Sequence, residues 1–374
     1  MSLRILPLHP SDVGAVFQLG QRIYADDPMW TPTLQAWEQP RLRAAARDPR
    51  RFVLFAAHRD GEVVGTLSAR RDRVFDENPD EKPIWFGHFE CVSEPDVCRA
   101  LFDAAIKQAR EWGASRIRGP MNLSRFEFVG LTVKGFDIPP PLMQGHHPRY
   151  YPRLIEDAGL SKHHDVYAYD TPLVVSDGRP RPIPAAFLEK AQACDIDGLE
   201  IRSGRRRTMG RDIEDVFMVL NEAYATVPDI SPMSRATFMG LGRMMFTLAG
   251  PELIQIATVK GRPVAFGVCI PELNEALIAC RGRLLPLGAV RLLRNLPRIH
   301  TAAFKLIGVV PDFRGSGVHA AVIAAIVRGA QKAGYDRIDG SVIDERNGPM
   351  RGVVEGLGLE IYRVYRFFER TIDR

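Results

Sequence analysis

The chain has 374 residues, enough for two domains of ordinary size. Its hydrophobic share of 45% and charged share of 25% are typical of a soluble globular protein. A run of about 18 apolar residues, which would predict a membrane span, does not occur. The formal net charge of +5 suits anionic ligands but falls short of a nucleic-acid-binding protein. We therefore expect no nucleic-acid partner and no membrane partner, and the lack of a signal-peptide core favours a cytoplasmic protein.

The cysteines are odd in number and show no metal-ligand spacing, so they read as reduced thiols: Cys91, Cys98, Cys194, Cys269 and Cys280. The paired histidines at 146–147 and 163–164 also lack a Cys or Glu partner at ligand spacing. We expect no metal.

The first half of the chain alternates strand and helix patterns. After a strand at 3–8 and a helix from 13 to 23, a segment rich in Pro, Trp and Arg (26–51) carries no regular pattern. The elements expected beyond it are a hairpin (52–58 and 63–69), strands at 84–92, 115–118 and 166–169, and helices at 95–112 and 150–158. A proline-rich stretch at 171–184 then predicts a linker.

The same order of elements returns after a short helix at 185–193. The expected strands are 199–202, 253–258, 263–270, one ending at Val310, 337–343 and 359–369, and the expected helices are 211–224, 234–248, 318–333 and 347–355, with a helical insert at 274–295. The insert is amphipathic, with arginines between leucines, and could cover a cleft or only the sheet. The repetition predicts a tandem α/β protein, with domains at 1–172 and 199–374 joined by 173–198.

A register of 221 residues relates the two halves. It aligns Trp112–Gly119 with Ala333–Gly340, and Gly87 with Gly308. At this register Arg314, Gly315 and Gly317 meet Ser93, Glu94 and Asp96. The acids of the first copy supply negative charge at the start of a helix, with Ser93 as its expected cap, and would repel a phosphate. The first copy is therefore expected to be structural.

The segment from Val310 to His319 joins an apolar strand to an alanine-rich helix. Unpaired amides and the dipole at a helix N-terminus favour an anion, and Gly315 and Gly317 let the backbone approach one closely. Arg314 adds a bidentate cation. The turn is therefore interpreted as a pyrophosphate site.

These features together resemble the GNAT acyltransferase superfamily. Its signature Q/R-x-x-G-x-G/A corresponds to Arg314–His319, followed here by an Asn-x-x-Met segment at Asn347 and by Gly-Leu-Gly-Leu at 356–359. The whole chain looks like a tandem GNAT protein with a degenerate first copy. The resemblance implies two domains, each with a mixed, twisted sheet flanked by helices, and transfer of an acyl group, usually from acetyl-CoA, to an amine of a small molecule or peptide. A monomer (an internal pseudo-dimer) or a homodimer is expected.

The resemblance also implies site residues. The strand before the turn would offer backbone groups to pantetheine, and the turn and the next helix would hold the rest of CoA: Ile307, Val309, Val310, Arg314, Gly315, Ser316, Gly317, Val318, His319 and Asn347. Two positions depart from the family. His319 replaces the final small residue, and Val354 occupies the place of the tyrosine that protonates the thiolate. Tyr362 or Tyr365 would then supply the acid, and Asp344 or Glu345 the base.

Two other interpretations remain open. The missing tyrosine allows a protein that binds CoA, or regulates, without catalysis. A related tandem fold transfers an aminoacyl group from tRNA, but it would need stronger positive charge than this chain carries.

Overall fold

The computed structural model describes residues 2–77, 81–125, 128–225, 235–278 and 288–373. In the first half the strands are β1 (Arg4–Pro7), β2 (Phe52–Arg59), β3 (Glu62–Arg70), β4 (Pro83–Cys91), β5 (Arg116–Gly119), β6 (Leu131–Lys134) and β7 (Ser161–Pro172). The helices are α1 (Gly14–Ile23), α2 (Gln35–Ala45), α3 (Arg73–Glu77), α4 (Pro95–Glu111) and α5 (Tyr151–Asp157).

The second half repeats this alternation. Its strands are β8 (Leu199–Ser203), β9 (Ile254–Val259), β10 (Arg262–Pro271), β11 (Thr301–Val309), β12 (Arg337–Asp344) and β13 (Glu360–Thr371). Its helices are α6 (Ala185–Gln192), α7 (Met209–Tyr224), α8 (Arg235–Leu248), α9 (Asn274–Leu277), α10 (Gly288–Asn295), α11 (Val318–Lys332) and α12 (Gly348–Gly356). The predicted insert at 274–295 thus yields α9 and α10, while its middle (279–287), including Cys280, lies outside the described residues.

Most predicted elements are present, and the structure adds α2, α3 and β6, which the sequence did not predict. The segment at 26–51 contains α2, although Pro40 lies inside this helix. Tertiary contacts compensate: Leu42 is fully buried, and the Glu38 carboxylate lies 3.0 Å from Arg41 and 3.5 Å from His88. The sequence of this segment has only a weak helical pattern, because α2 is stabilised by tertiary contacts rather than by its own helix propensity.

Each half folds around its own core on one continuous sheet. Among the described residues the strand order is β1-β2-β3-β4-β5-β13-β7-β12-β11-β10-β9-β8, and β6 pairs with β13. In the second half α11 packs closely on β10, because Gly267 has no side chain and Val322 and Ile326 occupy that space. Helices α7 and α8 belong to the same core. The α/β architecture is as predicted.

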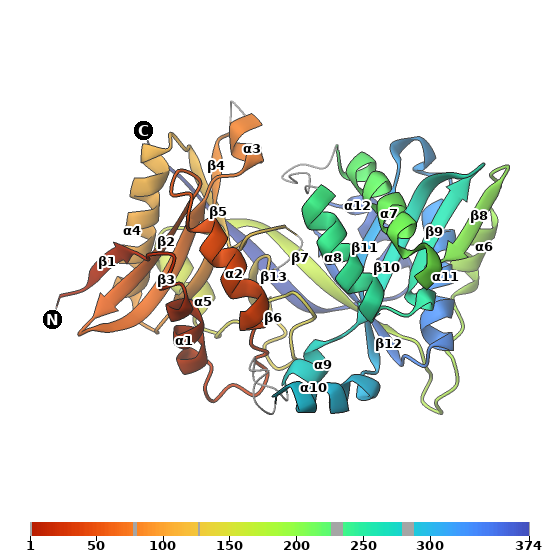
Figure 1. Ribbon diagram of the computed structural model, residues 1–374, viewed down its shortest axis with the longest axis horizontal. Coiled ribbons are helices and arrows are strands. Elements are labelled where there is room, and N and C mark those ends of the chain that lie inside the picture. Colours follow the sequence, from red (N-terminus) through yellow and green to blue (C-terminus); the bar gives the residue numbers. More distant parts are fainter. Residues whose placement is uncertain (1, 78–80, 126–127, 226–234, 279–287, 374) are drawn as a thin grey trace.

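The last strand of each half lies in the other half's sheet. Strand β13, at the C-terminus, pairs with β5 and β6, while β7 pairs with β12. The two exchanged strands also pair with each other and cross the centre of the molecule (Figure 1). Phe368 of β13 and Ile372, just after this strand, accordingly belong to the core of the first half. Either half is therefore completed by the other.

Candidate acyl-CoA site

Strands β11 and β12 diverge and leave a slot in the sheet. They pair in parallel from Thr301–Arg337 to Phe304–Gly340 and no further, although both strands continue. Hydrogen bonding alternates along an antiparallel strand, and the Val310 N–H donates to the Val264 carbonyl at 3.0 Å. The backbone groups of Ile307 and Val309 therefore point the other way, into the slot.

This alternation separates three residues that the sequence grouped together. Val310 faces β10 and is fully buried, and its carbonyl accepts from the Phe313 N–H, so it offers nothing to the slot. The Ile307 carbonyl accepts from the Tyr224 hydroxyl at 3.1 Å. Val309 and the Ile307 N–H have no partner across the slot in the part of the chain that the structure describes.

The first half has the same divergence, but its own chain closes it. Strands β4 and β5 pair only from Pro83–Arg116 to Trp85–Arg118. The chain after Gly119 then turns under β4: the Met121 N–H donates to the Phe86 carbonyl at 2.7 Å, and the His88 N–H donates to Asn122 Oδ1 at 2.8 Å. Phe86 and His88 align with Ile307 and Val309 at the register of 221 residues. The first copy thus lacks a slot because residues 121 and 122 fill it.

The turn between β11 and α11 presents amides at a helix N-terminus. Gly315 and Gly317 have φ of 79° and 87°, and Gly317 is the N-cap of α11. The N–H groups of Gly315, Gly317 and His319 have no hydrogen-bond partner within the described chain. The Ser316 N–H bonds to Phe313, and the Val318 N–H lies 3.4 Å from Ser316 Oγ. Three open donors beside the positive end of a fifteen-residue helix can hold an anion.

Two side chains at the turn have contacts that differ from those expected from the sequence. The Arg314 guanidinium donates to the Ala223 carbonyl at 2.6 Å, which ties the turn to the C-terminal end of α7. His319 is half-buried, and burial together with nearby Lys190 holds its pKa below the ordinary value. His319 is therefore neutral at pH 7, and the positive charges at the turn are those of Arg314 and nearby Lys190.

The corresponding helix start in the first half is already neutralised. Helix α4 begins at Pro95 with Glu94, rather than the expected Ser93, as its N-cap. Arg59 forms ion pairs with both Glu94 and Asp96. This position carries its own anions and its own cation, so it has no need of a bound phosphate.

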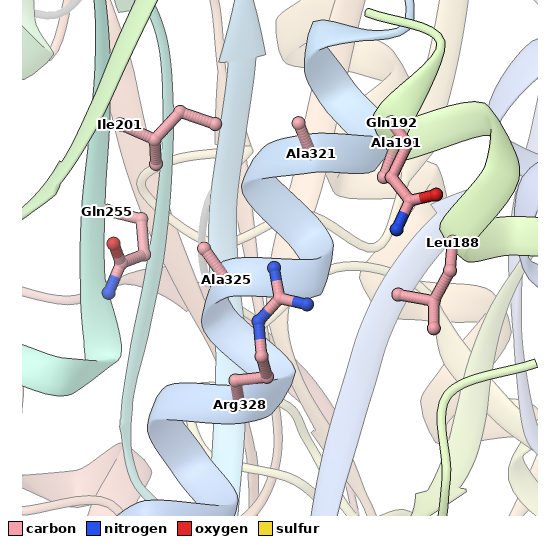
Figure 2. A pocket seen from close by; sticks show the side chains of 8 residues that line it. All are labelled: Leu188, Ala191, Gln192, Ile201, Gln255, Ala321, Ala325 and Arg328. Atoms are coloured by element: carbon pink, nitrogen blue, oxygen red, sulfur yellow. The ribbon is translucent and has the colours of Figure 1, made fainter.

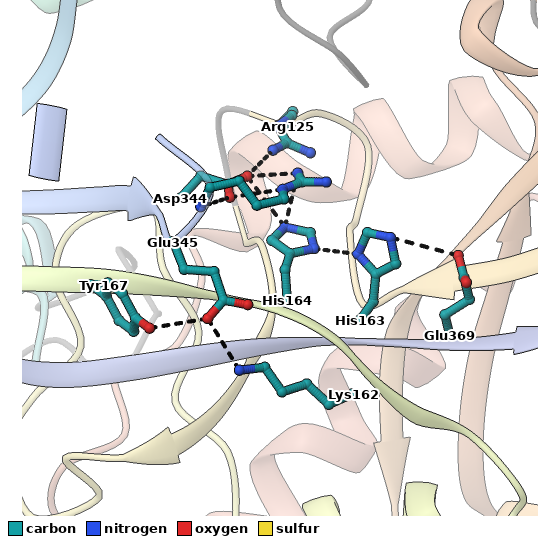
Figure 3. Close-up of polar contacts among 9 residues, drawn as sticks. Arg125, Lys162, His163, His164, Tyr167, Asp344, Glu345 and Glu369 are labelled. Carbon is teal, nitrogen blue, oxygen red and sulfur yellow. Dashed lines mark hydrogen bonds and ion pairs between the residues drawn. The ribbon is translucent and has the colours of Figure 1, made fainter. Parts of the chain in front are cut away.

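Asp344 and Glu345, the predicted bases, lie in a network of charged groups at the end of β12 (Figure 3). Asp344 contacts Arg125 at 2.8 Å and Arg346 at 2.7 Å. Burial raises the pKa of its carboxyl, but the hydrogen bonds from Arg346, together with nearby His164, outweigh burial and lower this pKa to about 2. Glu345 lies 3.1 Å from both Lys162 Nζ and the Tyr167 hydroxyl. Both carboxylates connect the two halves, and the low pKa of Asp344 makes that carboxylate poorly suited to accept a proton at neutral pH.

The two tyrosines predicted as acids have different surroundings. Tyr365 is fully buried in the cluster of Trp85, Met121 and Val129, remote from the turn, and burial raises its pKa. The Tyr362 hydroxyl donates to the Asp339 carboxylate, and burial with this contact raises its pKa, so the phenol keeps its proton. Val354, which occupies the place of the family's tyrosine, is part of α12. Asn347 caps α12 by accepting from the Met350 N–H at 3.2 Å.

The tertiary structure adds a cluster that the sequence did not indicate, at the closed end of the slot. Lys305 and Asp339 are the chain neighbours of Phe304 and Gly340, the last paired residues. Lys305 Nζ donates to the Leu142 carbonyl at 2.6 Å, and the Leu142 N–H donates to Glu272 Oε2 at 2.8 Å. Burial raises the pKa of Glu272 to about 7, with Lys305 opposing the rise and Asp339 adding to it. A lone glutamate after an apolar strand gives no local signal, so only the fold reveals it.

A pocket of about 330 Å³ lies elsewhere, at the edge of the second sheet (Figure 2). It is bounded by α6, α11, β8 and β9 and includes Gln255 and Arg328. Strand β10 and part of β9 separate it from the slot between β11 and β12. It is therefore distinct from the candidate site. No group of three or more His, Cys, Asp or Glu side chains able to hold a metal occurs among the described residues.

Solved structures share this architecture along the full chain. A tandem GNAT protein from the clavulanic acid biosynthesis pathway superposes with a TM-score of 0.54 at 14% identity, covering 100% of this chain and 99% of that one. A GCN5-related N-acetyltransferase from Sphaerobacter thermophilus gives 0.52 at 14% identity, covering 100% and 96%. The chain therefore has the tandem GNAT fold, with a slot and turn kept open in its second copy.

Two curated proteins resemble the sequence along its length. "Protein YghO" of Escherichia coli (strain K12) is 28% identical over 376 residues, covering 98% of this chain and 94% of that protein. A bacterial ceramide synthase of Caulobacter vibrioides is 28% identical over 383 residues, covering 99% and 98%. A scan against family models finds no match.

Proposed function

We propose that the second half binds an acyl-CoA and transfers its acyl group to an amine by direct attack. The observation that carries this proposal is the open slot of β11 and β12 ending at a turn with three free amides. Ile307 and Val309 would pair with pantetheine, and residues 314–319 would hold the pyrophosphate, chiefly through the amides of Gly315, Gly317 and His319. Asn347, the N-cap of α12, is also a proposed contact of CoA.

In the proposed reaction the neutral amine nitrogen attacks the thioester carbonyl and the C–S bond breaks. The nitrogen loses a proton as it becomes the amide, and CoA leaves as a thiolate that takes one up. Backbone N–H groups at the closed end of the slot would stabilise the oxyanion. Glu272 is the proposed base, because its pKa of about 7 lets it accept the ammonium proton near neutral pH. Tyr362, protonated and held by Asp339, is the proposed acid, in place of the tyrosine that Val354 replaces.

The acceptor is proposed from the relatives. A ceramide is the amide of a fatty acid and a long-chain amino alcohol, and the ceramide synthase of Caulobacter vibrioides matches this chain from end to end. We therefore propose a long-chain amino alcohol as acceptor, ahead of the soluble amine or peptide that the GNAT resemblance implies. The donor is then a fatty acyl-CoA as readily as acetyl-CoA.

Thiol release tests this proposal. Purified protein would be incubated with acetyl-CoA or palmitoyl-CoA and with sphinganine or, as matched short amines, ethanolamine and a lysine peptide. Thiol release with palmitoyl-CoA that requires sphinganine is expected. Release only with the short amines would overturn the acceptor but not the activity.

Binding separates catalysis from the alternative of a CoA-binding protein that catalyses nothing. Calorimetry with desulfo-CoA should show binding to the wild type and its loss in Arg314→Glu, which places a negative charge at the turn. Asp96→Asn, at the position of the first copy that aligns with Gly317, should bind normally. Binding without turnover on any amine would favour the non-catalytic protein, and full binding by Arg314→Glu would contradict the site itself.

A further inference from the structure

Helix α10 and the turn that follows it form two exposed ridges. Val290, Leu293 and Pro297 lie at i, i+3 and i+7 and are all exposed, Val290 by 48% and Leu293 by 66%. The second ridge follows the same spacing one residue later: Arg291, Arg294 and Arg298, also exposed. An offset of one residue is about 100° on a helix, so the cationic ridge flanks the apolar one.

The three arginines of this surface are available to bind an anion from outside the protein. None of the three forms an ion pair within the described chain. The acids near them have other partners, since Glu275 accepts from the His300 N–H at 2.9 Å and Asp336 lies 3.4 Å from the His300 ring. Leu293 is the most exposed of the large hydrophobic side chains among the described residues. The helix packs against α9 at the lower rim of the second half (Figure 1).

We propose that the surface of Val290, Leu293, Pro297, Arg291, Arg294 and Arg298 binds the surface of an anionic membrane. A helix that lies in a membrane interface inserts its apolar side chains into the bilayer, and its arginines pair with anionic lipid headgroups. Charge complementarity selects an anionic bilayer over a neutral one. The sequence led us to expect no membrane partner because it has no spanning segment, and the structure has no helix of spanning length and apolarity among the described residues. Binding at the membrane surface does not require a segment that spans the bilayer.

Vesicle flotation of the full-length protein tests the proposal. Binding is expected to vesicles of phosphatidylcholine with phosphatidylglycerol, to weaken with salt, and to be absent with phosphatidylcholine alone. Replacing all three arginines by glutamate should reduce partitioning by roughly 100-fold or more, since each arginine contributes about fivefold at an anionic surface. Val290→Ser with Leu293→Ser should reduce it as well.

The chain offers a matched control. Arg205, Arg206 and Arg207 are three further exposed arginines, and no apolar side chain among the described residues 199–211 around them is exposed. Their triple glutamate variant changes the net charge equally and should keep nearly all of the binding. Equal loss in both triple variants, no binding by the wild type, or self-association through α10 seen by light scattering would overturn the proposal. Circular dichroism shows whether a glutamate variant is misfolded. If it is, the variant with Val290→Ser and Leu293→Ser tests the proposal in its place. Because flotation uses no CoA and no amine, its result is independent of the proposed function.

Discussion

Glu272 is the residue on which the proposed chemistry depends most. Its carboxylate accepts two backbone N–H bonds and lies next to Lys305, and burial raises its pKa to about 7 although these contacts lower it. Because the base must be deprotonated, kcat/KM should rise with pH through about 7. Glu272→Gln should lower the rate by on the order of 100-fold and remove this rise. Glu345→Gln is the control and should keep the pH dependence. Its loss in Glu345→Gln rather than in Glu272→Gln would favour Glu345, a base predicted from the sequence.

Glu90 offers a test of burial in the first half. It accepts from the Tyr151 hydroxyl at 2.8 Å, and burial raises its pKa from 4.5 to about 7. Between these values the folded protein holds a proton that the unfolded chain releases, so the free energy of unfolding falls as pH rises. Glu90→Gln should therefore be more stable than the wild type at pH 8, by up to about 3 kcal/mol, and much less so at pH 4.5. Urea unfolding at both pH values measures this, and an equal difference at both would contradict it.

At the scale of elements, the glycines at the two ends of α11 can be compared directly. Gly317, the N-cap, has φ of 87°, and a Cβ there would lie 3.0 Å from the Lys190 carbonyl of α6. Gly334, past the C-terminus, has φ of 85° and open space around it. Alanine costs about 1–2 kcal/mol of backbone strain at either position. Only Gly317→Ala should weaken CoA binding, by at least about tenfold, as calorimetry would measure. Equal affinity in both variants would remove the turn from the site.

Helix α6 shows how an element can change meaning once it is placed. The proline-rich stretch before it predicted a linker between domains, and the boundaries at 172 and 199 remain a prediction. In the structure Phe187 of this helix packs on Ala320 and Ala324 of α11. Gln331 of α11 also donates to the Leu173 and Arg181 carbonyls of the preceding segment. The segment thus packs along α11, the helix that begins at the candidate turn.

For the whole molecule, strand exchange predicts that the halves stay together when the chain is cut. Asp177 and Gly178 lie in an exposed turn, where a protease site can be inserted. After cleavage the fragments should co-elute in size-exclusion chromatography, because β7 completes the second sheet and β13 the first. Separation into two folded species under native conditions would contradict this reading, as would a stable fragment 1–172, which lacks β13.

Local patterns in the sequence determined much of this protein. Hydrophobic periodicity and the turns at Gly61 and Gly261 were sufficient for most of the elements and for the duplication, because these depend on neighbours in the chain. The glycines around Arg314 led in the same way to the proposed anion-binding turn. The tertiary structure decided the rest. It placed β13 in the first sheet, closed the first slot with Met121 and Asn122, and buried Glu272 beside Lys305. Each of these is a contact between distant segments, and the pairing partner of a strand or the burial of a carboxylate is set by the assembled fold rather than by local sequence.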